Sequence, residues 1–412
     1  MKDGMCRFCG APLSVTFADL GMSPLSNAYL KPEQLKLHEN FYPLHAWVCG
    51  KCRLVQLEEF EPPEHIFDDE YAYFSSFSDT WLEHAKSYVD TMMQRFGFGA
   101  GSLVVEIASN DGYLLQYFVQ RGVPVLGVEP AANCARAAEE KGVPSVVKFF
   151  GTRTAEELVA QGRPADLLLG NNVLAHVPDL NDFVQGMKRM LKPGGVITME
   201  FPHLLTLIEQ NQFDTIYHEH FSYFSFLTVE QVFARHGLVL FDIDELPTHG
   251  GSLRIYGCHV EDATKPVGPR VEALKQKEHR AGLDGMAAYM AFDDKVKRTK
   301  RRLLEFLVRA KNEGRTIVGY GAPAKGNTLL NYSGVRTDFI DFTVDRSPHK
   351  QGCYLPGTHI PIHHPDRIRE ARPDYVLILP WNLRDEIVEQ VSYIREWGGQ
   401  FVLPIPEVAV LP

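Results

Sequence analysis

Several features that would tie this 412-residue chain to a particular environment are missing. It has no apolar run close to the roughly 18 residues of a membrane helix, so we expect no membrane span and no membrane partner. Its N-terminus lacks the apolar stretch of a secretory signal. Its seven cysteines are not spread like those of a disulfide framework. These absences predict a reduced, cytoplasmic protein.

A basic excess is also missing, because the formal net charge is −10. Bulk charge of this sign does not attract a phosphate backbone, so we expect no nucleic-acid partner. An anionic ligand would have to be held locally, by helix N-termini and a few basic side chains. With 45% hydrophobic and 23% charged residues the chain has an ordinary globular composition. Its length predicts two to three domains, and we expect a monomer or a small homo-oligomer.

Four of the cysteines form two Cys-x-x-Cys pairs. They are Cys6, Cys9, Cys49 and Cys52. Each such turn directs two thiolates at one point, and two turns complete the tetrahedral sulfur shell typical of zinc. Four thiolates leave no open coordination position, so the zinc is predicted to be structural. The alternative, four free buried cysteines, is disfavoured by the two matched pairs.

Short apolar runs alternate with amphipathic stretches through residues 101–260, after a helix expected at 79–96. The runs lie at 103–108, 124–129, 167–170, 196–201, 238–243 and 253–256. Alternation of strand and helix predicts a doubly wound α/β sheet. A charged connecting helix is expected within 265–312. A second α/β pattern follows from 315, with strands expected at 316–320, 339–344 and 375–379.

The strand at 103–108 leads into a loop of small residues that suits a cofactor. Glu106 lies near the end of the strand, and the loop includes Ala108, Asn110 and Gly112. Glu129 closes the next strand, where a carboxylate can accept hydrogen bonds from ribose hydroxyls. Nicotinamide and S-adenosylmethionine folds share this arrangement, and a Rossmann-like turn without a cofactor is a further alternative.

Two features favour S-adenosylmethionine. The loop has no G-x-G-x-x-G, and the fourth strand ends in Asn171 and Asn172. The turn L-K-P-G-G at 191–195, just before the fifth strand, resembles the turn that follows a helix in class I methyltransferases.

Ionisable and phenolic side chains crowd the segment 217–223, which contains Tyr217, His218, Glu219 and His220. The two histidines are two positions apart, so H-E-x-x-H zinc chemistry is excluded. One interpretation is a satisfied polar cluster beneath the sheet. The other is a general base flanked by an orienting carboxylate and a phenol. In an extended segment His218 and His220 would share a face, unless a turn intervenes.

The stretch G-Y-G-A-P-A-K-G at 319–326 precedes a predicted helix. Its backbone amides, with Gly321 at the turn and Lys325 adding charge, suit a pyrophosphate. Asp345 ends the next strand and mirrors a ribose-binding acid. The alternatives are a packing scaffold without a ligand and a nicotinamide site, although the expected third glycine is missing.

The order of motifs resembles the sugar C-methyltransferases of unusual deoxysugar biosynthesis. The matching segments are the two Cys-x-x-Cys pairs, E-I-A-S-N-D-G at 106–112, N-N-V-L-A-H at 171–176, Y-H-E-H at 217–220, H-G-G-S-L-R at 249–254 and the loop at 319–326. The resemblance covers nearly the whole chain. Ala108 is a departure, because the family usually has glycine there.

The resemblance implies three domains: a zinc-binding domain at 1–70, a methyltransferase domain at 71–260 and a C-terminal Rossmann-like, nucleotide-sugar-binding domain at 261–412. It implies methylation at C-3 of a nucleotide-linked, usually dTDP-linked, 4-keto-6-deoxyhexose. An enolate would attack the methyl group of S-adenosylmethionine. Alternatives are methylation at C-5, O- or N-methylation of another small molecule, and a non-catalytic nucleotide-sugar-binding protein.

The resemblance also implies a role for each of several residues. His220 is the leading candidate for the base, with Glu219 orienting or tuning it. Contacts with the sugar and the enolate oxygen are expected from Tyr217, His176 and Tyr71. Contacts with the rest of the substrate are expected from His249, Arg254, Gly321, Lys325 and Asp345.

Overall fold

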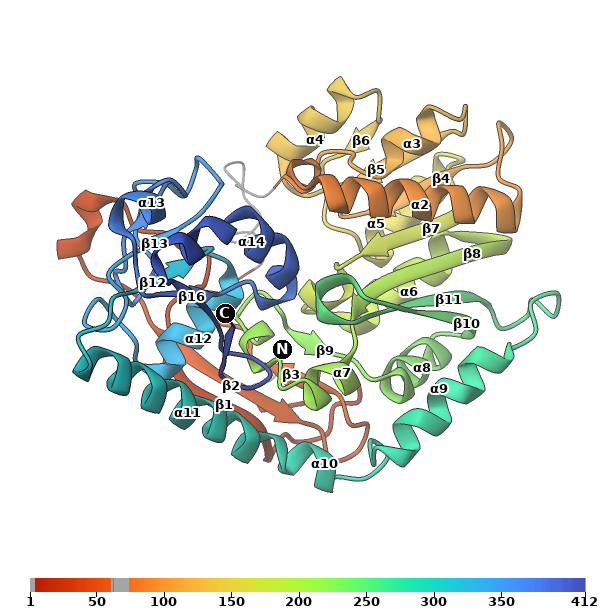
Figure 1. Cartoon of the computed structure of the whole chain (residues 1–412). Helices are drawn as coiled ribbons and strands as arrows, with labels where there is room; N and C mark the ends of the chain where they lie inside the picture. The colour runs from red at the N-terminus through yellow and green to blue at the C-terminus, as the bar shows by residue number, and fades with distance from the viewer. Residues whose placement is uncertain (1–3, 61, 63–73, 412) are drawn as a thin grey trace.

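The computed structural model describes residues 4–60, 62 and 74–411 and arranges them around three β-sheets (Figure 1). The smallest sheet is antiparallel, with the order β1-β2-β3-β9. Its strands are β1 (Val15–Ser23), β2 (Tyr42–Val48), β3 (Val55–Leu57) and β9 (Ser222–Tyr223). Because β9 begins two residues after His220, the N-terminal sheet is completed by the end of the predicted catalytic segment.

A seven-stranded sheet forms the middle of the molecule, with the order β10-β11-β8-β7-β4-β5-β6. Its strands are β4 (Val104–Ile107), β5 (Val125–Val128), β6 (Ser145–Val146), β7 (Ala165–Asn171), β8 (Leu191–Pro202), β10 (Leu238–Leu246) and β11 (Ser252–His259). The first five are parallel, and β11 and β10 extend them antiparallel. The predicted doubly wound sheet is confirmed. Its parallel strands bring the segments after Ile107, Val128 and Asn171 to one edge.

Helices cover both faces of this sheet. One face carries α2 (Asp79–Phe96), α3 (Leu115–Val119) and α4 (Ala132–Glu140), and the other carries α5 (Thr152–Ala160), α6 (Leu180–Met190) and α8 (Phe226–Arg235). Successive strand residues serve opposite faces, since Val104 packs toward α2 and Val105 toward α6. The helix expected at 79–96 has the predicted bounds. The short helix α7 (Leu204–Glu209) follows β8.

The C-terminal part begins with α9 (Pro269–Arg280), α10 (Ala287–Met290) and α11 (Phe292–Asn312). A six-stranded sheet follows, ordered β14-β13-β12-β15-β16-β17 and parallel except for β17. Its strands are β12 (Ile317–Tyr320), β13 (Thr343–Val344), β14 (Ile362–His363), β15 (Tyr375–Ile378), β16 (Gln400–Leu403) and β17 (Ala409–Leu411). Its helices are α12 (Ala324–Ser333), α13 (Arg367–Ala371) and α14 (Arg384–Gln390). This sheet confirms the second predicted α/β unit.

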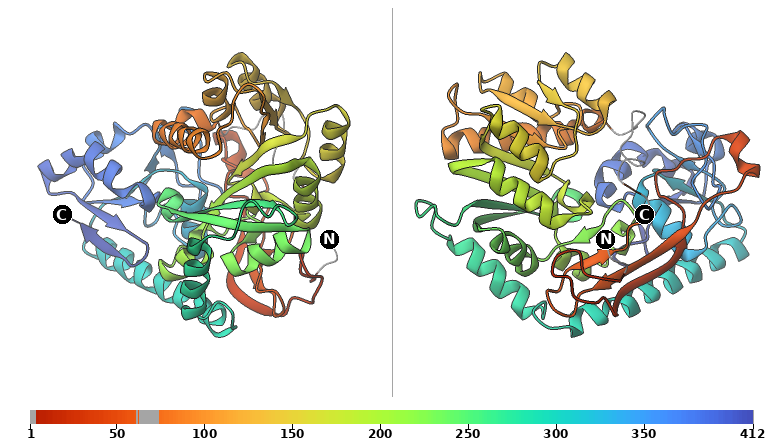
Figure 2. Two further views of the ribbon diagram at one scale, coloured as in Figure 1. Left: turned by 90° about the vertical axis from the view of Figure 1, so that its right-hand side faces the viewer. Right: turned by 180° about the vertical axis from the view of Figure 1, so that it is seen from behind.

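The N-terminal sheet joins the two α/β units. The view from behind in Figure 2 shows β1 and β2 lying along α11. Phe17 of β1, Leu205 of α7, Val296 of α11 and Leu329 of α12 share one buried apolar cluster. The charged helix predicted within 265–312 therefore packs on one face through α11. Among the helices that the structure describes, none is both long and apolar enough to cross a membrane.

Candidate functional site

The four predicted metal ligands meet at one point. The Sγ atoms of Cys6 and Cys52 lie 3.6 Å apart, those of Cys9 and Cys49 lie 3.5 Å apart, and all four lie within 4.8 Å of one another. Zn–S bonds of about 2.3 Å in a tetrahedron separate the sulfurs by about 3.8 Å. The sulfur positions therefore fit a structural zinc ion with a complete shell.

The loop after β4 has a distinctive backbone. Ala108, Asn110 and Gly112 have φ angles of 55°, 49° and 72°, so every second residue is left-handed. Glycine adopts this conformation at the lowest cost. The alanine at position 108, where the resembled family usually has glycine, is therefore held in an unfavourable backbone conformation. A Cβ on Gly127 of β5 would lie 2.4 Å from Ser109 Oγ, so the loop passes close to the neighbouring strand.

Glu129 anchors this loop. Its Oε2 accepts a hydrogen bond of 2.8 Å from the backbone amide of Asn110, and its Oε1 accepts one of 2.9 Å from that of Ala131. Each carboxylate oxygen keeps a second lone pair for a hydroxyl. Glu106 is fully buried near Tyr113, and burial raises the pKa of Glu106 well above its usual range. The two acids thus stand at neighbouring strand ends, as predicted.

Polar atoms without partners collect at the same edge. Ser109 Oγ, Asp111 Oδ1 and Asn172 Oδ1 are enclosed and have no hydrogen-bond partner among the described residues. Asn172 Nδ2 lies 3.0 Å from His249 Nε2, which brings the 249–251 loop to this edge. Buried polar atoms are normally satisfied, so these atoms fit the polar groups of a bound S-adenosylmethionine.

A turn separates the side chains of the 217–220 segment. The backbone amide of His220 donates to the carbonyl of Tyr217 at 2.8 Å. His218 Nε2 lies 3.2 Å from the Pro43 carbonyl, whereas Glu219 Oε1 accepts from Asn27 Nδ2 at 2.7 Å. The shared face expected for His218 and His220 in an extended segment is therefore not formed.

His220 is held from both sides of its ring. Nδ1 lies 3.0 Å from the Thr215 carbonyl and Nε2 lies 2.8 Å from the Tyr217 hydroxyl. A carbonyl only accepts, so Nδ1 carries the hydrogen and Nε2 accepts from Tyr217. Burial holds the pKa of His220 well below its usual range, and the neighbouring His176 ring lowers it further, because two adjacent imidazoles do not readily both take up a proton. His220 is therefore a neutral imidazole at pH 7.

His176 lies directly against His220. Their rings meet edge to face with centroids 4.7 Å apart, so the fourth-strand motif and the 217–220 segment form one cluster. Burial lowers the pKa of His176 to about 4. A cavity of about 10 Å³ adjoins His220 and is lined also by Ser222 and Tyr223. Tyr71 lies outside the described residues.

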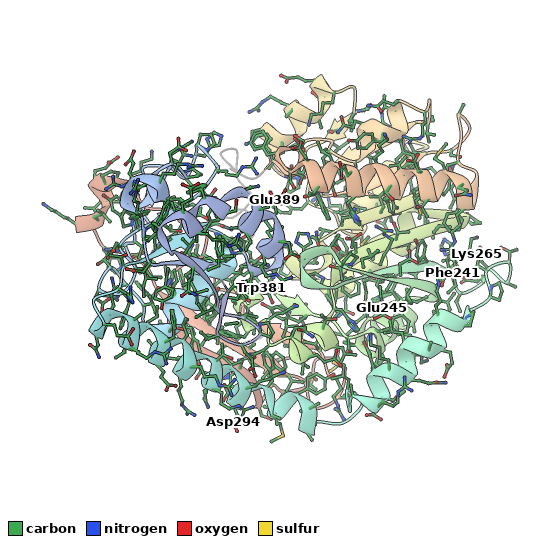
Figure 3. All side chains as sticks on the ribbon, in the orientation of Figure 1. Phe241, Glu245, Lys265, Asp294, Trp381 and Glu389 are labelled. Atoms are coloured by element: carbon green, nitrogen blue, oxygen red, sulfur yellow. The ribbon has the colours of Figure 1, made fainter. Side chains whose placement is uncertain are left out.

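The C-terminal part reaches this cluster through Lys325 and Trp381. Figure 3 labels Trp381 where that part faces the middle domain. A Cβ on Gly250 would lie 2.7 Å from the Trp381 ring, so that approach requires glycine. Trp381 Nε1 donates to Asp214 Oδ2 at 2.7 Å, and Lys325 Nζ lies 4.8 Å from the Trp381 ring centroid. Burial raises the pKa of Asp214 to about 6 and lowers that of Lys325.

The loop after β12 repeats the geometry of the cofactor loop. Asp345 accepts from the backbone amides of Ala322 at 2.7 Å and Ser347 at 2.9 Å, as Glu129 does from Asn110 and Ala131. Gly321 has a φ of 89°, and a Cβ there would lie 2.6 Å from Pro380 Cδ. Asp345 therefore positions the loop that precedes α12.

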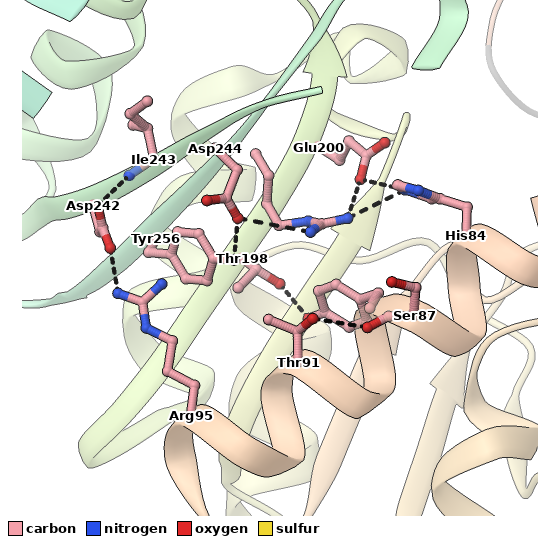
Figure 4. A network of polar contacts seen from close by, with 12 residues as sticks. His84, Ser87, Thr91, Arg95, Thr198, Glu200, Asp242, Ile243, Asp244 and Tyr256 are labelled. Carbon is pink, nitrogen blue, oxygen red and sulfur yellow. Dashed lines mark hydrogen bonds and ion pairs between the residues drawn. The ribbon is translucent and has the colours of Figure 1, made fainter. Parts of the chain in front are cut away.

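Arg254, predicted to contact the substrate, is instead bound to acidic side chains of the protein. Its guanidinium lies 2.8 Å from Glu200 Oε2 and 3.8 Å from Asp244 Oδ2. Figure 4 shows both of these carboxylates, with His84 of α2 on the far side of Glu200. Glu200 also pairs with His84 at 3.0 Å and accepts from Thr248 at 2.9 Å. The Arg254 side chain is only 6% exposed, so it serves a buried ion pair of the methyltransferase sheet.

Comparison with known proteins decides the family. Residues 6–67 match a model described as "Putative zinc binding domain", residues 81–242 match "Methyltransferase domain", and residues 247–406 match "C-methyltransferase C-terminal domain". The C-methyltransferase NovU of Streptomyces niveus is 36% identical over 406 residues, which are 98% of this chain and 96% of that protein. The chain belongs to this C-methyltransferase family.

Other similarities are partial. A ubiquinone biosynthesis O-methyltransferase of Bartonella bacilliformis is 28% identical over 126 residues, 29% of this chain and 51% of that protein. A magnesium protoporphyrin IX methyltransferase of Synechocystis PCC 6803, solved with bound S-adenosylmethionine, covers 47% of this chain and 88% of its own at 14% identity, with a TM-score of 0.34. Neither adds to the full-length match.

Several predictions are thereby confirmed. The protein is an S-adenosylmethionine-dependent C-methyltransferase with a class I methyltransferase sheet and an N-terminal zinc site. In this C-methyltransferase, sequence reasoning missed Thr215 and Asn27, which orient His220 and Glu219. No local signal marks them, because Thr215 acts through its carbonyl and Asn27 is 192 positions from Glu219.

Proposed function

We propose that this C-methyltransferase methylates C-3 of a nucleotide-linked 4-keto-6-deoxyhexose, with dTDP as the nucleotide, through an enolate. A carbon beside a ketone becomes a nucleophile when its proton is removed, which a C-methyltransferase needs a base to achieve. The observation that carries the proposal is the neutral imidazole of His220, which Tyr217 and Thr215 hold against His176.

The base is His220 Nε2. Its lone pair accepts the C-3 proton, while the Nδ1–H to Thr215 carbonyl bond keeps the ring in that tautomer. In the free enzyme Nε2 accepts from the Tyr217 hydroxyl at 2.8 Å. Transfer of that phenolic hydrogen bond to the C-4 oxygen frees Nε2 and supplies a donor where the enolate charge develops. Because the pKa of His220 is low, no proton has to leave it first at neutral pH.

Positive charge near the base favours the enolate. The Lys325 ammonium contributes to the low pKa of His220 and of His249, so its potential reaches both rings. The same potential stabilises an anion formed beside them. His176 and Tyr71 are assigned to the sugar. Glu219, predicted to orient His220, instead accepts from Asn27, and His220 is oriented by Thr215 and Tyr217. S-adenosylmethionine, when bound, supplies the electrophilic methyl group.

The cofactor is assigned to the edge formed by β4, β5 and β7. Glu129 would hold the ribose hydroxyls, and the left-handed residues Ala108, Asn110 and Gly112 would let the backbone approach the cofactor. Further contacts are assigned to Glu106, Asn171 and Asn172, whose polar atoms are enclosed at this edge.

The nucleotide end of the substrate is assigned to the C-terminal part. Gly321 and the α12 N-terminus offer backbone amides to a diphosphate, and Asp345 holds their loop. His249 and Lys325 face the sugar across the junction. We also propose domain boundaries at 70/71 and 260/261, with the substrate between the second and third domains.

The test uses a dTDP-linked 4-keto-6-deoxyhexose and S-adenosylmethionine carrying a ¹³C methyl group. Carbon NMR of the product should place the label on C-3. A label on C-5 would refute the assigned position, and a label on oxygen would refute the enolate. UDP- and GDP-linked sugars of the same configuration serve as controls for the nucleotide, and equal turnover with them would refute dTDP selectivity.

A further inference from the structure

The zinc-binding segment is joined by strand pairing to β9, the strand that follows the proposed base His220. β3 pairs with β9 through Gln56 opposite Ser222 and Val55 opposite Tyr223. The Leu57 amide donates to the Phe221 carbonyl at 3.0 Å. Any displacement of β3 is therefore transmitted to the residue next to His220.

Arg7, between Cys6 and Cys9, makes a second connection. Its side chain is buried, and its guanidinium donates to three carbonyl oxygens: Leu57 at 2.6 Å, Pro178 at 2.9 Å and Val177 at 3.4 Å. The guanidinium carbon also lies 5.2 Å from the Phe221 ring centroid. Val177 follows His176 and Phe221 follows His220, so one side chain touches the neighbours of both histidines.

The position of Arg7 is set by the first zinc knuckle, the turn from Cys6 to Cys9. Its amide donates to Gln56 Oε1 at 2.9 Å, and Gln56 Nε2 lies 3.2 Å from Cys6 Sγ. Asn181 Nδ2 donates to the carbonyls of Arg7 and Phe8, each at 3.0 Å. The knuckle backbone is thus held by β3 on one side and α6 on the other.

We propose that Arg7 is a positioning residue for methyl transfer. Anchored by the zinc knuckle, its side chain fixes the positions of the loops that carry His176 and His220. The inference rests on the proposed role of His220. A planar guanidinium can reach carbonyls on two segments at once, which a lysine ammonium cannot do with the same geometry. A shift of about 1 Å in a positioned group can lower turnover about 100-fold.

The expected effect of Arg7→Met is a 10- to 100-fold lower kcat, with KM and the dissociation constant for S-adenosylmethionine changed by less than about twofold. Arg7→Lys should recover part of kcat. Zinc content, measured by atomic emission, should equal that of the wild type. Lys51→Met is the matched control, because Lys51 lies exposed between Cys49 and Cys52, and no hydrogen bond or ion pair joins its side chain to another of the described residues.

A readout independent of activity is the NMR spectrum of ¹⁵N-labelled histidine in the S-adenosylhomocysteine complex. The His176 and His220 resonances, assigned with His176→Gln and His220→Asn, should shift in Arg7→Met and Arg7→Lys but not in Lys51→Met. Unshifted resonances or a wild-type kcat would overturn the inference. If Arg7→Met loses zinc or fails to fold, Arg7→Lys decides by the same criteria. An inactive wild type would refute the proposed function alone, since the resonances still test Arg7.

Discussion

Replacing Arg254 with methionine separates two roles for this arginine. The structure assigns it to a buried ion pair with Glu200, in which the side chains are 6% and 0% exposed. A substrate ligand would raise KM when removed and leave the fold intact. Loss of a buried partner would instead destabilise the fold, because the Glu200 carboxylate would keep, among the described side chains, only His84 and the Thr248 hydroxyl as partners.

The size of the effect follows from this burial. Breaking one partner of a buried pair costs about 3–5 kcal/mol. For a domain of about 150–250 residues each kcal/mol lowers Tm by about 2–4 °C, so we expect a fall of about 6–20 °C. Arg153→Met is the control: Arg153 of α5 also pairs with a carboxylate, that of Glu157 at 3.2 Å, but its side chain is 94% exposed, so its loss should leave Tm almost unchanged.

The assay is thermal unfolding followed by circular dichroism, alongside steady-state kinetics. The double variant Glu200→Gln, Arg254→Met should regain much of the lost stability, because it leaves no unpaired buried charge. If Arg254→Met melts within about 2 °C of the wild type but has a tenfold higher KM for the acceptor, Arg254 is a substrate ligand and our interpretation of the ion pair is wrong.

Three further predictions concern the cofactor loop and the buried histidines. Ala108→Gly should raise the free energy of unfolding by up to about 1 kcal/mol, because a left-handed alanine costs about 1–2 kcal/mol; Ala137→Gly, in the interior of α4, should lower it in the same urea titrations. Glu129→Gln should weaken S-adenosylmethionine binding about 10- to 100-fold by calorimetry, since hydrogen bonds to a charged group contribute about 1.5–3 kcal/mol; unchanged affinity would contradict the ribose assignment. Burial lowers the pKa of His249 to about 4, so below pH 6.5 the unfolded chain takes up a proton that the folded chain refuses. Stability should therefore fall between pH 6.5 and 4 by up to about 1.4 kcal/mol per pH unit, and His249→Gln should remove that share of the slope.

Local sequence was sufficient for the central elements of the fold. Ser78 caps the N-terminus of α2, and Gly97 ends the helix with a φ of 68°. Both ends of that helix are therefore determined by residues directly next to it. The core strands β4 and β5 are buried and, apart from Glu106 in β4, apolar, as buried parallel strands are. The cysteine pairs predicted the zinc site because ligand spacing is itself a local property.

Long-range pairings could not be predicted in the same way. β9 has two residues and exists because β3, some 165 positions earlier, pairs with it. The turn that parts His218 from His220 competes with an extended conformation of the same residues, and tertiary contacts select it. Arg254 follows two glycines in a motif typical of a ligand-binding loop. It nevertheless lies in β11, where packing of α2 on the sheet buries its side chain.

The most direct test of the central claim is exchange of the substrate C-3 proton with D₂O. The enzyme is incubated with the 4-keto sugar nucleotide and S-adenosylhomocysteine, so that no methyl group can be transferred, and proton NMR follows the C-3 signal. We expect the wild type to lose this signal, and His220→Asn to retain it while it still binds S-adenosylmethionine. Loss of the signal at the wild-type rate in His220→Asn would contradict the assignment of His220 as the base.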